Sequence, residues 1–197
     1  MTDFFALLDE PRRPWLEADS LKTKFLARSA EVHPDRVHQS SASDKLTATQ
    51  RYTELNAAYH CLGEPRHRIR HLLELELGAK PSDLTNVPDD LMELFFCVGT
   101  SIRKVDVLLV EKTKATSPML QVQFFERSQD WVEQLGDLRQ KISNRRDPLV
   151  EELKTMGAAW ENRSPKPTGR LLEIWRLLSF YDRWLAQIQE RVVQLSF

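Results

Sequence analysis

The feature that most constrains the fold of this chain is the tripeptide His33-Pro34-Asp35, which separates two amphipathic segments. The segment before it spans residues 19–32, and the longer segment after it spans residues 44–62. Because proline disfavours the helical conformation in the preceding residue, we expect the first of these helices to stop near His33. The pattern therefore predicts two helices joined by a turn that exposes an imidazole and a carboxylate together.

Apolar residues recur at helical spacing on both sides of the tripeptide. They are Phe4, Leu7 and Leu8 in a first short segment, Leu21, Phe25 and Val32 in the second, and Tyr52, Leu55, Ala58, Tyr59 and Leu62 in the third. Steps of three and four residues place each set on one face of a helix. The sequence thus predicts three helices whose apolar faces pack against one another.

Capping residues mark where these helices begin and end. Asp19 or Ser20 is suited to the N-cap of the second helix, and Gly63 to the C-cap of the third. A fourth helix is expected over residues 65–77, because proline is favoured at a first helical position. Gly78 then ends it.

The order of short helix, loop, helix, His-Pro-Asp, loop and helix resembles that of a J-domain. J-domains are the modules through which co-chaperones act on DnaK-type chaperone ATPases. The resemblance implies a chaperone-binding surface, with these residues: His33, Pro34, Asp35, Lys22, Lys24, Arg28 and Arg36. Without the resemblance, the tripeptide reads as a helix-terminating turn in which Asp35 bonds the local backbone.

The remainder of the chain is helix-forming with few interruptions. We expect one helix from Pro88 to about Lys114 and another from near Pro118, which Pro148 would kink or split. After a loop at 162–169, the stretch 170–195 carries the strongest period, with apolar residues at steps of four and three: Ile174, Leu178, Tyr181, Leu185, Ile188, Val192 and Leu195. Such a seam is typical of a helical bundle.

The sequence therefore predicts an all-α protein. Residues 1–77 form a J-domain, an antiparallel helical hairpin with flanking short helices. Residues 78–87 form a linker, and residues 88–197 form a C-terminal three-helix bundle that binds a client.

The whole arrangement resembles the HscB-type co-chaperones of iron–sulfur cluster assembly. The resemblance is carried by the J-domain, by the run Glu54-Leu-Asn-Ala-Ala-Tyr59, by Leu91-Met92-Glu93 and by the closing heptad-like helix. It implies that the protein stimulates ATP hydrolysis by a DnaK/HscA-class chaperone and delivers an iron–sulfur scaffold protein to it. A J-domain co-chaperone with another client, bound by the same bundle, is the alternative.

The resemblance also implies a client-binding patch at Leu91, Met92, Phe95 and Phe180. An apolar stripe at helical spacing is equally what a helix buries in a core, so the sequence leaves both possibilities open. The chain departs from the family after the patch. The family's acidic run is replaced by Phe-Cys-Val-Gly at 96–99, followed by Arg103 and Lys104.

Composition argues against several classes of protein. The formal net charge of −1 predicts neither nucleic-acid nor anionic-membrane binding. No apolar run approaches the ~20 residues that span a bilayer. The first residues lack the basic region of a signal peptide. We expect a cytoplasmic protein.

The chemistry-bearing residues predict no catalysis, metal or cofactor. Cys61 and Cys97 form no CxxC pair, and their apolar surroundings predict buried free thiols. His67 and His71 are four residues apart, as a metal pair on a helix would be. Because arginines crowd them and no HExxH glutamate is present, a solvated helix face is the favoured interpretation.

Overall fold

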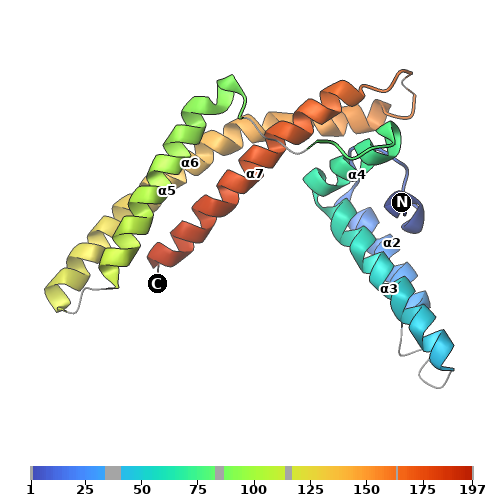
Figure 1. The fold of residues 1–197 in the computed structure, drawn as a ribbon, viewed down its shortest axis with the longest axis horizontal. Helices are drawn as coiled ribbons and strands as arrows, with labels where there is room; N and C mark the ends of the chain where they lie inside the picture. The colour runs from blue at the N-terminus through green and yellow to red at the C-terminus, as the bar shows by residue number, and fades with distance from the viewer. Residues whose placement is uncertain (1, 34–40, 83–86, 114–116, 163, 197) are drawn as a thin grey trace. The chain divides into compact units, whose positions relative to one another are not determined.

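The computed structural model describes residues 2–33, 41–82, 87–113, 117–162 and 164–196. All regular secondary structure in these residues is helical (Figure 1). The elements are α1 (Phe4–Leu7), α2 (Ala18–Glu31), α3 (Ala42–Gly63), α4 (Pro65–Leu77), the 3₁₀ helix η2 (Asp89–Leu91), α5 (Met92–Lys112), α6 (Pro118–Ala159) and α7 (Thr168–Ser196). The prediction of an all-α fold is confirmed.

The chain folds as two compact units. The first comprises Met1–Ser82 with Val150–Trp175, and the second comprises Asp83–Leu149 with Arg176–Phe197. The two long helices α6 and α7 therefore contribute residues to both units. The sequence-based division into residues 1–77 and 88–197 has different boundaries and stays a prediction.

In the first unit, α2 and α3 run antiparallel beside one another, with α1 and α4 packed on α3 (Figure 1). The core consists of side chains from all of these helices and from the ends of α6 and α7. Those exposed by less than 2 % include Phe5, Leu8, Leu21, Leu62, Ile69, Leu72, Leu153, Trp160 and Ile174. The helical hairpin predicted around His33 is thus present.

Trp15 joins the segment between α1 and α2 to α6 within the first unit. The Arg68 guanidinium lies 5.5 Å from its ring centroid, and the Lys154 ammonium lies 5.1 Å from it. Beneath Trp15, α6 carries Gly157, where an added Cβ would come within 2.8 Å of the Trp15 Cβ. The absence of a side chain at Gly157 is what allows this approach.

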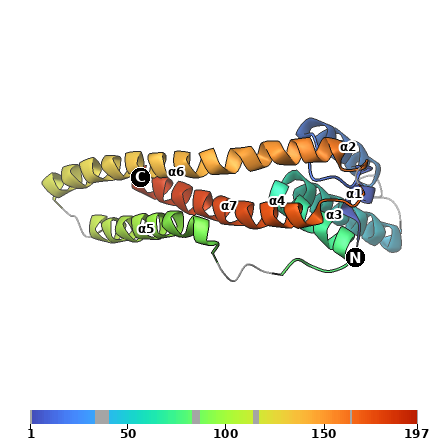
Figure 2. The same ribbon diagram turned by 90° about the horizontal axis from the view of Figure 1, so that it is seen from above.

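The second unit is built from α5 and parts of α6 and α7, which lie beside one another (Figure 2). From Tyr181 onward the predicted seam of α7 packs here: Tyr181, Ile188 and Leu195 are less than 5 % exposed, and Leu185 and Val192 are partly buried. Two ion pairs also connect the helices. The Arg191 Nε lies 2.9 Å from Asp106 Oδ1, and the Arg146 Nε lies 2.8 Å from Asp182 Oδ1.

Pro148 does not split α6, which continues from Pro118 to Ala159. Proline removes one amide donor and leaves the carbonyl four residues earlier, that of Asn144, without its helical partner. Both Pro148 and Asn144 are exposed, so water can bond this carbonyl without rupture of the helix. The predicted split of the helix is therefore wrong, because the sequence could not show that this site faces solvent.

The helix ends match the predictions at some positions and not at others. Gly78 ends α4 with a φ of 71° and donates to the Glu74 carbonyl, as expected. The N-cap of α2 is Glu17, two residues before Asp19 and three before Ser20, and its side chain makes no capping bond. Gly63 lies inside α3, because Glu64 at the C-cap turns the chain in an extended conformation toward Pro65. None of the described helices is long and apolar enough to cross a bilayer.

Candidate chaperone-binding and client-binding surfaces

Aromatic contacts along the α2–α3 hairpin hold the end that carries His33. Phe25 of α2 stacks on Tyr59 of α3 with 4.3 Å between ring centroids. Nearer the turn, the His33 ring meets the Tyr52 ring edge-on at 5.4 Å. His33 directly follows the α2 C-cap. It is half-buried, and its contact with Tyr52 keeps the ring against α3.

Four of the seven residues predicted to bind a chaperone are seen in the structure. Pro34, Asp35 and Arg36 lie outside the described residues. Lys22 and Arg28 are exposed on α2. Six positions place them about 120° apart around the helix axis, on either side of the buried face, so they do not form one basic stripe.

Lys24 has a structural role that the sequence did not reveal. Its Nζ donates to the Asp9 carbonyl at 2.6 Å and pairs with the Glu10 carboxylate at 3.1 Å. The Glu10 side chain is only 3 % exposed. Asp9 has a φ of 54° and directly follows the end of α1, so Lys24 ties that turn to α2. A cation committed to a buried acid is poorly placed to meet another protein.

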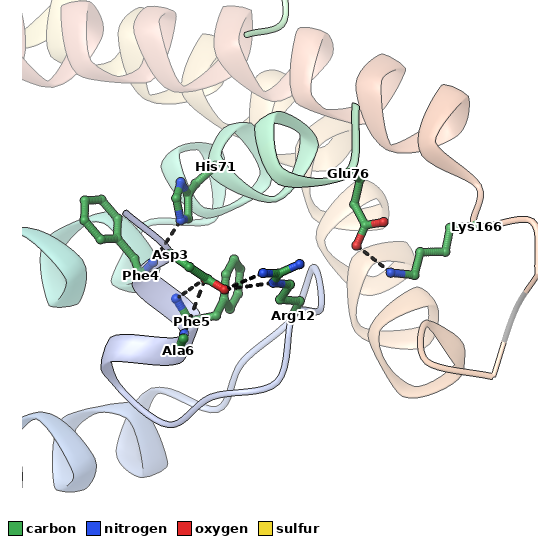
Figure 3. A network of polar contacts seen from close by, with 8 residues as sticks. All are labelled: Asp3, Phe4, Phe5, Ala6, Arg12, His71, Glu76 and Lys166. Atoms are coloured by element: carbon green, nitrogen blue, oxygen red, sulfur yellow. Dashed lines mark hydrogen bonds and ion pairs between the residues drawn. The ribbon is translucent and has the colours of Figure 1, made fainter. Parts of the chain in front are cut away.

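The start of α1 is held by a network of polar contacts (Figure 3). The Asp3 carboxylate caps the helix by accepting from the amides of Phe5 and Ala6 at 3.0 and 3.3 Å. The other carboxylate oxygen accepts from Arg12 Nε at 2.9 Å. Asp3 therefore fixes both the first turn of α1 and the segment that follows it.

His71 supplies the remaining acceptor in this network. Its Nε2 accepts from the Phe4 amide at 3.1 Å, across 67 residues of chain, and its ring is 5 % exposed (Figure 3). Burial lowers the pKa of His71, which favours the neutral ring that the bond requires. The expectation of a solvated helix face is wrong for His71, although His67 is exposed.

Arg68 is the second buried polar residue of α4. Its guanidinium donates to the carbonyls of Pro14 and Leu62 at 2.9 and 2.6 Å. Burial lowers the pKa of Arg68 to about 10. Sequence reasoning did not identify the structural roles of Arg68 and His71, because Pro14 and Phe4 lie far from them along the chain.

The two cysteines differ from the prediction in their exposure. Cys61 is half-buried, and burial raises the pKa of its thiol to about 11, so the thiol stays protonated at neutral pH. Cys97 is exposed, because the apolar residues around it on α5 do not all face the core. Among the described residues, no group of three or more potential ligands is arranged to hold a metal ion.

The predicted client patch is divided between core and surface. Leu91 is fully buried and Phe180 is 7 % exposed, and both pack in the core of the second unit. The interpretation of these two as an open binding surface is therefore not met, because α7 and η2 use them to close the bundle. Met92 is half-buried and Phe95 is 40 % exposed, so the patch retains these two.

Phe96 is an exposed aromatic residue that the sequence prediction left out of the patch. It is 58 % exposed, and its ring lies against Phe95 with 5.6 Å between centroids. The four-residue step from Met92 to Phe96 was the signal that could have found it, since such residues share a helix face.

Curated relatives and solved structures identify what the chain is similar to. It is 37 % identical over 91 residues to the co-chaperone protein HscB homolog of Chromobacterium violaceum, a match over 46 % of this chain and 52 % of that protein. It is 33 % identical over 74 residues to the HscB homolog of Vibrio cholerae, over 38 % and 43 % of the two chains. The chain thus spans about half the length of the curated relatives it matches. No family model matches it.

The similarity to solved structures extends over more of the chain than the similarity in sequence. Chaperone HscB from Vibrio cholerae superposes with a TM-score of 0.58 over 99 % of this chain and 96 % of that one, at 19 % identity. The chain resembles the HscB-type co-chaperones. Human co-chaperone HscB gives a TM-score of 0.60 over 98 % and 81 %, again at 19 % identity. The HscB-like architecture therefore extends over almost the whole chain, while the contact residues stay predictions.

Proposed function

We propose that this protein is a co-chaperone that stimulates ATP hydrolysis by a DnaK/HscA-class chaperone and delivers an iron–sulfur scaffold protein to it. The observation that carries the proposal is the α2–α3 hairpin with His33 held at its turn, in a chain that is 37 % identical over 91 residues to an HscB homolog. The protein itself catalyses no reaction in this proposal. It activates the ATPase of its partner.

The activation is a shift of the chaperone's conformational equilibrium. Such a shift requires that the co-chaperone bind one chaperone state more tightly than the other. His33, Pro34 and Asp35 make the differential contact, and Asp35 pairs with a cation of the chaperone. A charge-assisted bond of this kind contributes ~1.5–3 kcal/mol. Lys22, Arg28 and Arg36 speed the encounter with an acidic chaperone surface.

The client is an iron–sulfur scaffold protein that binds the second unit through Met92 and Phe95. These are the two residues of the predicted patch that keep exposed surface. The alternative is a J-domain co-chaperone with another client. Residues 96–99 lack the family's acidic run, which is an argument for this alternative.

Chaperone activation is tested by His33→Gln in a steady-state ATPase assay with the chaperone from the same genome. We expect the rate to fall to that of the chaperone alone, with unchanged helical content and melting temperature. His67→Gln, which alters an exposed histidine of α4, is the matched control and should stimulate normally. Normal stimulation by His33→Gln would show that the tripeptide is only a turn.

Client identity is tested by binding to the purified scaffold protein. The double variant Met92→Ala/Phe95→Ala should lose scaffold binding while still stimulating the chaperone without scaffold. Leu91 and Phe180 are left intact, because truncation of these buried side chains would destabilise the unit by ~2–5 kcal/mol. Stimulation of the chaperone without any binding of the scaffold by the natural sequence would select the alternative client.

A further inference from the structure

A groove between α5 and α6 in the second unit is used by none of the roles above. It has a volume of about 420 Å³. Its lining residues are Thr100, Arg103, Lys104, Val107, Arg127 and Trp131. The α5 residues follow the steps that keep side chains on one helix face, and Arg127 and Trp131 are one turn apart on α6. The groove is therefore a regular feature of the helix pair.

Three of the residues that line the groove are cations, and none is an acid. Arg127 pairs with Glu111 at 3.1 Å and lies over the Phe124 ring at 5.2 Å. Arg103 is close to the Thr100 hydroxyl at 3.4 Å. In the described parts of the chain, neither Arg103 nor Lys104 is paired with a carboxylate. Two exposed cations are thus left for an anionic partner.

The remaining surface of the groove is apolar and accessible. Val107, which is 58 % exposed, lines the groove from α5, and the half-buried Trp131 lines it from α6. Phe96, one turn before Thr100 on α5, extends the same face toward Met92. An apolar strip bordered by cations fits a protein segment that carries both an apolar side chain and carboxylates.

We propose that the groove binds an acidic segment of the client, with a large apolar side chain over Val107 and Trp131 and carboxylates at Arg103 and Lys104. The identity of the client rests on the proposed function, but the chemistry of the groove does not. A nucleic acid fits less well, because the net charge of −1 gives the chain no extended positive field.

The first test measures the groove without a chaperone or a client. The probe is a short fluorescein-labelled peptide in which glutamates flank one phenylalanine, followed by fluorescence anisotropy at low salt. We expect it to bind, and the same peptide with lysines for the glutamates not to bind. Arg103→Glu/Lys104→Glu should weaken binding about tenfold, and added salt should weaken it as well.

The matched control is Arg176→Glu/Arg183→Glu, which reverses two exposed arginines of α7 that do not line the groove. It makes the same change in net charge, so general electrostatics would affect both double variants equally. Equal weakening by both variants, or no peptide binding at all, overturns the proposal. Tighter binding of a single-stranded oligonucleotide than of the acidic peptide overturns it as well.

The second test separates this proposal from the proposed function. In the ATPase assay without client, Arg103→Glu/Lys104→Glu should stimulate the chaperone like the natural sequence, while its binding to the scaffold protein falls. A chain that binds the acidic peptide yet stimulates no chaperone contradicts only the co-chaperone function. A chain that stimulates fully, with scaffold binding unaffected by the charge reversal, contradicts only the groove.

Discussion

The close approach of Trp15 to α6 predicts that alanine at position 157 is less favourable than alanine at position 136. Replacement of Gly157 by alanine places a Cβ 2.8 Å from the Trp15 Cβ and 3.2 Å from its backbone nitrogen. Neither atom is the end of a flexible side chain, so the backbone before α2 must shift. Overpacking of this kind costs ~1–3 kcal/mol. The same change gains ~1 kcal/mol, because alanine favours helix over glycine.

Gly136 in the same helix provides the control. A Cβ added there meets no atom within 4 Å, so Gly136→Ala should keep the full gain in helix propensity, ~1 kcal/mol. Since that gain is common to both variants, the difference between them isolates the contact with Trp15 at ~1–3 kcal/mol. Urea unfolding followed by circular dichroism measures both, and hydrogen exchange of residues 15–17 reports the local shift. A Gly157→Ala variant as stable as Gly136→Ala would show that the segment around Trp15 accommodates the added methyl group at no cost.

Two further predictions concern polar side chains in the first unit. Lys24→Ala leaves the buried Glu10 carboxylate without its cation and should lower the free energy of unfolding by ~1–3 kcal/mol, whereas Lys22→Ala on the same helix should change it by less than ~0.5 kcal/mol. The pKa of His71 is lower in the folded than in the unfolded state, so unfolding takes up protons and stability should fall as the pH drops through about 6.5, its ordinary value. His71→Gln keeps an acceptor without titrating and should remove this slope in pH-dependent urea melts, while His67→Gln should retain it.

Periodicity was sufficient to predict the helices and their buried faces, because each depends on residues close together in sequence. The seam of α7 and the fourth helix over residues 65–77 both follow from spacing and from the terminal glycine and proline. Spacing was not sufficient where a helix is apolar on most of its surface. Around the start of α5, Leu91 is buried while Phe96 and Cys97 are exposed. The spacing groups Met92 with Phe96 on one face, but it does not say which face the core covers.

Contacts between distant residues were also beyond sequence reasoning. His71 accepts from Phe4 across 67 residues, and Arg68 donates to Pro14 across 54. From spacing alone, both polar side chains are expected to face solvent. They are buried because α1 and the segment after it bring backbone groups that need partners, and a buried amide or carbonyl without one costs ~1–3 kcal/mol.

The basic residues of this chain separate into two roles according to the burial of what they bond. Lys24 lies beside a carboxylate that is 3 % exposed, so its charge is part of the fold, and its loss would leave a buried anion. Arg103 and Lys104 border an open groove in which no carboxylate of the described residues opposes them. Their charge is therefore available to another molecule. A count of basic residues along α2 and α5 does not distinguish Lys24 from Arg103 and Lys104. The distinction comes from whether a carboxylate lies beside the cation, which makes it structural, or does not, which leaves it able to select a partner.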